Sequence, residues 1–174
     1  MSQQWKHDER TTCRMCGSER TGPVGREGPD CDKTAPWAIQ CKRAPTPTLP
    51  ASWLRQAQRD AERDELRRPW VLVQSWYRRG RPTTFLATTE LRTLALYSAK
   101  ADFGTRLHRS ASKPRLSRVE TLELLGAQEQ PWLLVQHIFA GVNLATLDFR
   151  VLCQLGRRAG VVSDQPTPEL RGAV

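Results

Sequence analysis

Residues 28–43 read GPDCDKTAPWAIQCKR and contain the strand around which the rest of the fold is predicted. A strand points alternate side chains to opposite faces. One face of residues 37–42 then carries three core-forming side chains, Trp37, Ile39 and Cys41. The opposite face places the Gln40 amide beside the Lys42 ammonium, next to a hairpin partner that begins at Asp30. A core strand that presents an amide and an ammonium together suggests a functional site.

Helices are expected on both sides of this strand. Residues 5–16 predict a short helix, and Glu9 shares a face with Cys13 and Cys16 because residues three or four apart lie on the same side. Residues 18–30 are rich in Gly and Pro and predict a loop. Residues 50–67 predict a second helix. Its apolar face consists of Trp53, Leu54, Ala57, Ala61 and Leu66.

The later part of the chain contains an internal repeat. PWVLVQ at residues 69–74 returns as PWLLVQ at 131–136, and LATTELRTL at 86–94 returns as LATLDFRVL at 144–152. β-branched and aromatic residues favour strands, so each copy predicts two strands and a helix. In the first copy these are strands 70–77 and 84–88 and helix 90–97; the second copy has a shorter hairpin. Chance similarity between two amphipathic stretches is the alternative.

The expected domain organisation follows from these patterns. Residues 1–99 form the main domain, and residues 100–118 form a basic linker with six Lys or Arg against one Asp. Residues 119–160 form a small ββα-like segment. Residues 161–174, which include two prolines, form a flexible tail.

The charge of the chain points to a polyanionic partner. The net charge is +9 at pH 7 and the pI is about 10.0, which is typical of proteins that bind nucleic acid. Solubility alone is the simpler explanation. No run of eighteen apolar residues predicts a membrane span, and the N-terminal residues lack an apolar secretion signal. We therefore expect a cytoplasmic protein.

The chain has five cysteines, which in a cytoplasmic protein argue against a disulfide framework. Cys13 and Cys16 form a CxxC pair, and with Cys31 and Cys41 they would supply four zinc ligands. A zinc ribbon needs a second close pair, however, and Cys31 and Cys41 are ten residues apart. Buried, reduced core cysteines are therefore the preferred interpretation.

The order of these features resembles the core of PD-(D/E)XK nucleases. The sequence GPD at residues 28–30 precedes a hairpin and a hydrophobic strand that ends in QCK at residues 40–42. The pattern is similar to archaeal-type Holliday-junction resolvases and their phage relatives, and its QxK form is similar to Mrr-type restriction endonucleases. In such enzymes a preceding helix contributes a glutamate, which corresponds here to Glu9. The resemblance covers residues 5–97.

The resemblance implies an α/β fold with a restriction-endonuclease-like core: a central mixed sheet flanked by helices, followed here by the duplicated ββα segment. It also implies hydrolysis of DNA phosphodiester bonds with Mg²⁺ or Mn²⁺. Mg²⁺ prefers hard oxygen ligands. The implied ligands are Asp30, Glu9, the Gln40 amide oxygen and the backbone carbonyl of Cys41. Lys42 would orient the nucleophile and stabilise the transition state.

The likeness also implies how DNA is held. Four arginines flank the expected site and would contact the DNA backbone: Arg10, Arg20, Arg26 and Arg43. A homodimer with two active sites would cut both strands of duplex or branched DNA. One departure from the family is Gln40, which replaces the more usual glutamate and is expected to weaken metal binding.

Simpler interpretations exist for each residue. Asp30 would cap a turn after Gly-Pro, Lys42 would end a solvated strand, and Glu9 would be an exposed helix residue. A basic protein that binds nucleic acid without catalysis, with or without a Cys-rich zinc site, is the alternative function. It does not require the set of Glu9, Asp30, Gln40 and Lys42.

Overall fold

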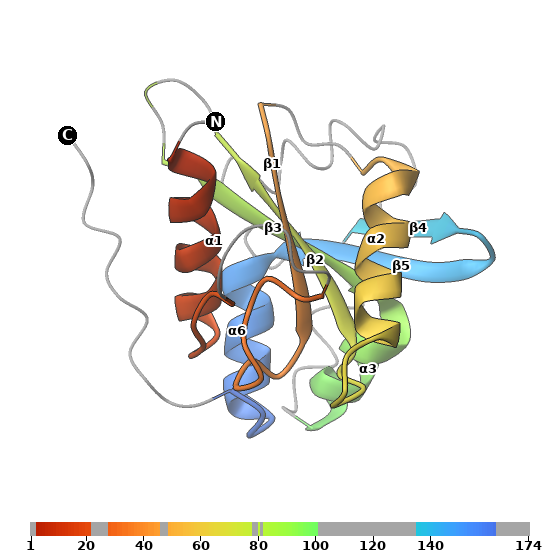
Figure 1. Cartoon of the computed structure of the whole chain (residues 1–174). Coiled ribbons are helices and arrows are strands. Elements are labelled where there is room, and N and C mark those ends of the chain that lie inside the picture. Colours follow the sequence, from red (N-terminus) through yellow and green to blue (C-terminus); the bar gives the residue numbers. More distant parts are fainter. Residues whose placement is uncertain are drawn as a thin grey trace.

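The computed structural model describes residues 3–21, 28–45, 49–77, 80, 82–100 and 135–162. In this part of the chain a five-stranded mixed sheet packs against four helices, which confirms the expected α/β class. Figure 1 shows the elements: α1 (Gln4–Met15), β1 (Ala38–Ala44), α2 (Ala51–Glu62), β2 (Trp70–Trp76), β3 (Thr84–Glu90), α3 (Leu91–Lys100), β4 (Val135–Phe139), β5 (Val142–Asp148) and α6 (Phe149–Arg158).

The strands lie in the order β1-β2-β3-β5-β4. β1 and β2 are parallel, with Gln40 opposite Leu72, and α2 connects them. The other neighbouring pairs are antiparallel. β2 is buried along its whole length because it has a strand on each side and helices over both faces, which explains its nearly continuous apolar sequence. β1 is an edge strand, so its outer edge is available to the segment that precedes it.

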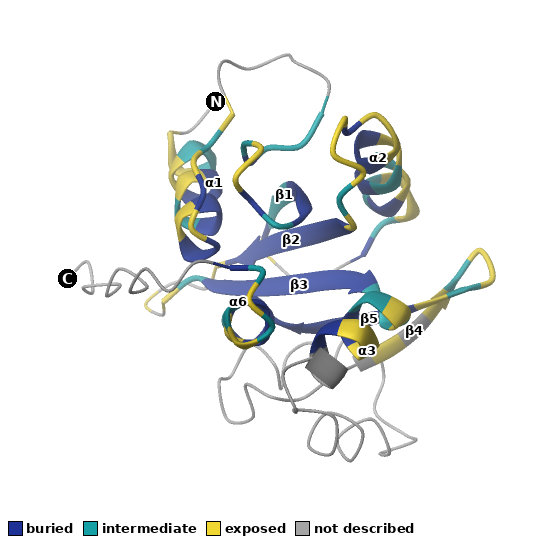
Figure 2. Cartoon of the chain, turned by 90° about the horizontal axis from the view of Figure 1, so that it is seen from below, coloured by how far each residue is buried: buried dark blue, intermediate teal, exposed yellow. Residues whose placement is uncertain are grey.

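The two faces of the sheet form separate cores, and the alternation predicted for β1 is confirmed. Ile39 belongs to the larger core together with residues of α1, α3 and α6. Ala38 belongs to the smaller core under α2. Trp37, fully buried, packs edge-on against Tyr97 and Phe149 in the larger core. Figure 2 shows α1 and α2 on either side of β1.

The internal repeat is confirmed as two strand–strand–helix units, β2-β3-α3 and β4-β5-α6. The β4–β5 hairpin turns through Ala140 and Gly141, both at positive φ (48° and 79°), which suits a tight two-residue turn. β5 pairs with β3, so the second unit extends the sheet of the first. Three parts of the expected organisation lie outside the described residues: 101–118 of the linker, 119–134 of the ββα-like segment with the opening of the second copy, and 163–174 of the tail.

The predicted end of the helix at residues 50–67 is wrong, because α2 ends at Glu62. The Asp64 carboxylate accepts a hydrogen bond from the Arg68 backbone N–H at 3.0 Å, which favours a turn. Arg67 lies at a φ of 52°, outside the helical region. Leu66, expected on the buried face, is 53% exposed. Helix α3 runs three residues beyond its predicted end at 97.

The expectation that the cysteines are reduced is wrong for Cys13 and Cys31, which form a disulfide with their Cα atoms 5.4 Å apart. Sequence spacing did not reveal it because an isolated antiparallel bridge between Arg20 and Cys31 folds the loop back beside α1. Cys16 and Cys153 are buried and free, as expected of core cysteines. Every helix of the described part is too short or too polar to cross a membrane.

Candidate active site

Asp30 lies against the outer edge of β1. Its backbone N–H donates to the Ile39 carbonyl at 2.7 Å, so the segment before the strand extends the sheet locally. Its carboxylate accepts hydrogen bonds from the Cys41 backbone N–H at 2.6 Å and from Gln40 Nε2 at 2.8 Å. The edge position of β1 leaves the Cys41 N–H free to make this bond, which fixes the carboxylate beside the strand.

Gln40 uses only half of its amide. Its side chain is 5% exposed, and while Nε2 donates to Asp30, Oε1 is buried without a hydrogen-bond partner. A buried carbonyl oxygen without a partner is destabilising unless a donor or a cation reaches it. The site therefore contains an acceptor that needs a partner, next to a carboxylate.

The environment of Asp30 disfavours its charge. Burial raises the pKa of Asp30 from 3.8 to about 7, against the hydrogen bond from the Cys41 backbone, which lowers it. The charges of Glu9 and Asp60 raise this pKa further, and the charge of Lys42 lowers it. A carboxylate in this setting gains stability from a nearby cation.

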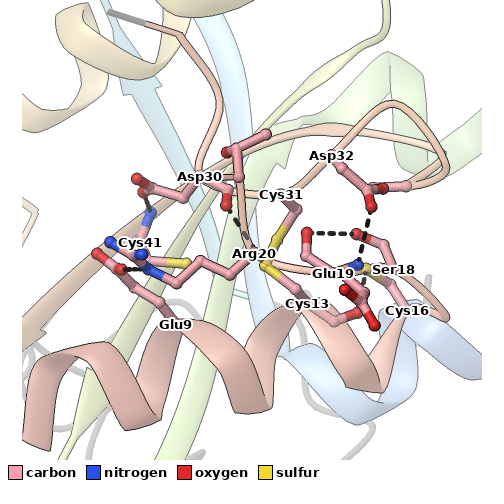
Figure 3. Close-up of a disulfide and its surroundings, with 12 residues drawn as sticks. Glu9, Cys13, Cys16, Ser18, Glu19, Arg20, Asp30, Cys31, Asp32 and Cys41 are labelled. Carbon is pink, nitrogen blue, oxygen red and sulfur yellow. Dashed lines mark hydrogen bonds and ion pairs between the residues drawn. A yellow bond between two sulfur atoms is a disulfide. The ribbon is translucent and has the colours of Figure 1, made fainter. Parts of the chain in front are cut away.

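Glu9 reaches the site from α1, as the helix periodicity predicted. It is 6% exposed and forms an ion pair with Arg20 (Figure 3). The Cys41 thiol lies near both Glu9 and Asp30; burial raises its pKa well above the ordinary value, and the two charges raise it further. This thiol is therefore neutral at pH 7 and adds no negative charge beside the two carboxylates.

Lys42 lies on the α2 side of β1. Its ammonium donates to Gln56 Oε1 at 2.8 Å. Asp60, one helical turn after Gln56, is 7% exposed, and its Oδ2 has no hydrogen-bond partner. Burial raises the pKa of Asp60, while the charges of Arg63, Lys42 and Arg59 lower it. The structure thus brings Lys42 within electrostatic range of Asp30 without a direct contact.

The four predicted DNA-binding arginines differ in their surroundings. Arg10 is exposed on α1. Arg20 is paired with Glu9, and Arg43 forms an ion pair with Asp8. The Arg43 guanidinium also lies 4.3 Å from the centre of the Tyr77 ring. Arg26 lies outside the described residues.

Gln56 and Asp60 were missed from the sequence, although a signal was present. Asp60 lies three residues after the buried Ala57, and Gln56 lies three residues after Trp53 and four before Asp60, so the helix periodicity places both on the side of α2 that packs against the sheet. Asp8 was also missed; it is buried on α1 and accepts a hydrogen bond from the Ser75 hydroxyl at 2.8 Å.

The residues of the site suit a hard divalent cation. Within the described residues, no group of three or more His, Cys, Asp or Glu side chains is arranged to hold a metal. The oxygen set is instead smaller, consisting of the Asp30 carboxylate and the unpartnered Gln40 Oε1, with Glu9 nearby. Mg²⁺ is usually bound through one or two carboxylates and keeps several waters, so this set fits it. The pairing of Cys13 with Cys31 removes two of the four thiolates that the alternative zinc site would need.

Comparison with protein-family models, with curated proteins and with solved structures found no match to this chain.

Proposed function

We propose that the chain is a metal-dependent endodeoxyribonuclease with a restriction-endonuclease-like core, as its resemblance to PD-(D/E)XK enzymes implies. The observation that carries the proposal is the contact between Asp30 and Gln40 at the free edge of β1, which leaves a buried amide oxygen without a partner. Lys42 follows two residues later on the same strand. Structural stability alone does not explain this combination, because each of its polar groups is costly to bury.

Each residue has a distinct role in the proposed reaction. Asp30 and Gln40 would hold Mg²⁺ or Mn²⁺, with Glu9 joining directly or through water once Arg20 turns to phosphate. The metal, when bound, lowers the pKa of its water and neutralises charge that develops on the phosphate. Lys42 would place a positive charge at the same phosphate and orient the attacking water. The backbone carbonyl of Cys41 remains a proposed additional ligand.

The surface around β1 suits a DNA backbone. The two helices that flank this strand carry exposed arginines: Arg10 and Arg14 on α1, and Arg55 and Arg59 on α2. Together with a net charge of +9 they favour a polyanionic substrate. We infer that this substrate is duplex or branched DNA, a four-way junction among them, and that a homodimer presents two sites to the two strands.

The proposal is tested by incubating labelled junction, duplex and single-stranded DNA with the protein and Mg²⁺ or Mn²⁺. The wild-type protein should cleave at least one substrate, and EDTA should stop it. Asp30→Asn and Lys42→Ala should lose cleavage by about 100-fold or more while still binding DNA. Asp32→Asn, which changes a carboxylate two residues from Asp30, is the matched control and should cleave normally.

The outcomes separate this function from its alternative. If the wild-type protein and every variant bind DNA but none cleaves it with Mg²⁺ or Mn²⁺, the result would favour a nucleic-acid-binding protein without catalysis. Cleavage that survives in both Asp30→Asn and Lys42→Ala would place the activity elsewhere or in a contaminant.

A further inference from the structure

The hydrogen-bond partner of Lys42 is a side chain of α2. The Lys42 ammonium donates to Gln56 Oε1 at 2.8 Å, and Lys42 is half-buried between the strand and the helix. A lysine side chain has a flexible four-carbon stem and three N–H donors, so a hydrogen bond to one fixed acceptor restricts where its charge lies. The position of the charge therefore depends on which end of the Gln56 amide faces it.

The Gln56 amide has Asp60 as a second neighbour on α2. The two ends of a glutamine amide have nearly the same shape but opposite hydrogen-bonding character. Asp60 makes a side-chain hydrogen bond with Gln56, which lowers the pKa of Asp60. Gln56 Oε1 accepts from the Lys42 ammonium, so the Nε2 end of the amide is the one left to donate to the Asp60 carboxylate.

The burial of Asp60 also favours a role beyond packing. It is 7% exposed, and burial raises its pKa. A buried acid that served only packing would be replaceable by an apolar residue with a gain in stability. Asp60 instead lies on the helix face turned to β1, within electrostatic range of Lys42 and Asp30.

We propose that Gln56 and Asp60 are positioning residues for Lys42: Asp60 orients the Gln56 amide, and Gln56 holds the Lys42 ammonium in place for phosphodiester cleavage. This inference rests on the proposed nuclease function. Neither residue would contact substrate or metal. Their loss should therefore lower kcat and leave KM and DNA affinity unchanged.

The first test compares two glutamines of the same helix. Gln56→Leu is expected to lower kcat by about 10- to 100-fold, the usual effect of losing a partner that orients a catalytic group. DNA binding measured with Ca²⁺, and KM, should not change. Gln58→Leu, which alters a half-buried glutamine two residues away, is the control and should keep wild-type kcat.

A double-mutant cycle then separates positioning from a structural role. Gln56→Glu presents a carboxylate oxygen to Lys42 whichever way it turns, so it should retain most of the activity that Gln56→Leu loses. Asp60→Ala should lower kcat in the wild-type background. The same change should have no further cost in the Gln56→Glu background, because no amide remains to be oriented. The comparison of Asp60→Ala in the two backgrounds does not use Gln56→Leu, so it holds even if that variant fails to fold.

Three results would overturn the inference. Equal kcat in Gln56→Leu and Gln58→Leu would show that the contact with Lys42 is not used. An equal cost of Asp60→Ala in both backgrounds would show that Asp60 acts on stability and not on the amide. If the wild-type protein cleaves no DNA, the proposed function itself fails and the inference fails with it, whereas wild-type cleavage with unaffected Gln56→Leu overturns the inference alone.

Discussion

The ionised form of Asp30 is expected to destabilise the protein when no cation is bound. Burial raises the pKa of this carboxyl group from 3.8 to about 7, so the folded state keeps a proton that the unfolded chain releases. The stability contributed by the protonated group is present at low pH and lost as the pH rises toward about 7. At pH 8 the raised pKa corresponds to about 4 kcal/mol of lost stability.

Asp30→Asn should therefore stabilise the protein at pH 8 in the presence of EDTA. The variant loses the charge but keeps an acceptor for the Cys41 N–H, with weaker hydrogen bonds that cost about 1 kcal/mol each. A net gain of about 2 kcal/mol remains, which corresponds to a rise in Tm of about 5 °C for a chain of this length. Thermal unfolding measured between pH 5 and 8 should show the gain shrinking as the pH falls. Added Mg²⁺ should raise the Tm of the wild-type protein alone.

Asp32 provides the matched control because its pKa moves in the opposite direction. Burial acts to raise the pKa of Asp32, but hydrogen bonds from Thr34 and Glu19 lower it below its ordinary value. Asp32→Asn should therefore lower the Tm at pH 8. The reasoning is refuted if Asp30→Asn lowers the Tm at pH 8 as Asp32→Asn does, or if its effect does not depend on pH.

Further predictions concern DNA contacts, the disulfide and the core. Arg59→Ala should weaken DNA binding and reduce the slope of log affinity against log salt by about 1; an unchanged slope would remove this arginine from the interface. Cys31→Ser should lower the free energy of unfolding by about 3 kcal/mol, because the Cys13–Cys31 bond closes a loop of 18 residues; equal urea midpoints with and without the bond would contradict this. Gly156→Ala should cost about 1–3 kcal/mol, since a Cβ there would lie 2.8 Å from the buried Trp37 ring; thermal unfolding would show no change if the ring can move aside.

Much of the fold was predictable because its period-two and helical patterns are strong. The alternation of β1 correctly assigned Ile39 to one core and Ala38 to the other. The repeat correctly predicted a second strand pair and helix, and the tight β4–β5 turn follows from its shorter connection. Within the site, the helix periodicity correctly predicted that Glu9 faces inward. The order of the segments around β1 correctly predicted that Asp30 lies beside Gln40.

The remaining features depend on contacts between segments far apart in sequence. The disulfide requires the loop to return to α1 through the bridge at Arg20, which spacing between cysteines does not reveal. The end of α2 is set by Asp64 and Arg68, whose guanidinium also donates to the carbonyls of residues 32 and 35. The contact between Lys42 and Gln56 depends on how α2 packs on β1. Neither the strand periodicity of β1 nor the helix periodicity of α2 specifies this packing.

The most direct test of the proposed site is Mn²⁺ binding followed by electron paramagnetic resonance on the wild-type protein and three variants. The wild-type protein should bind the ion through Asp30 and Gln40, Asp30→Asn should lose this binding, and Asp32→Asn should retain it. Gln40→Glu adds a negative charge to the same place and should bind more tightly. Equal affinity in all four proteins, or no binding by any of them, would contradict a metal site at the edge of β1.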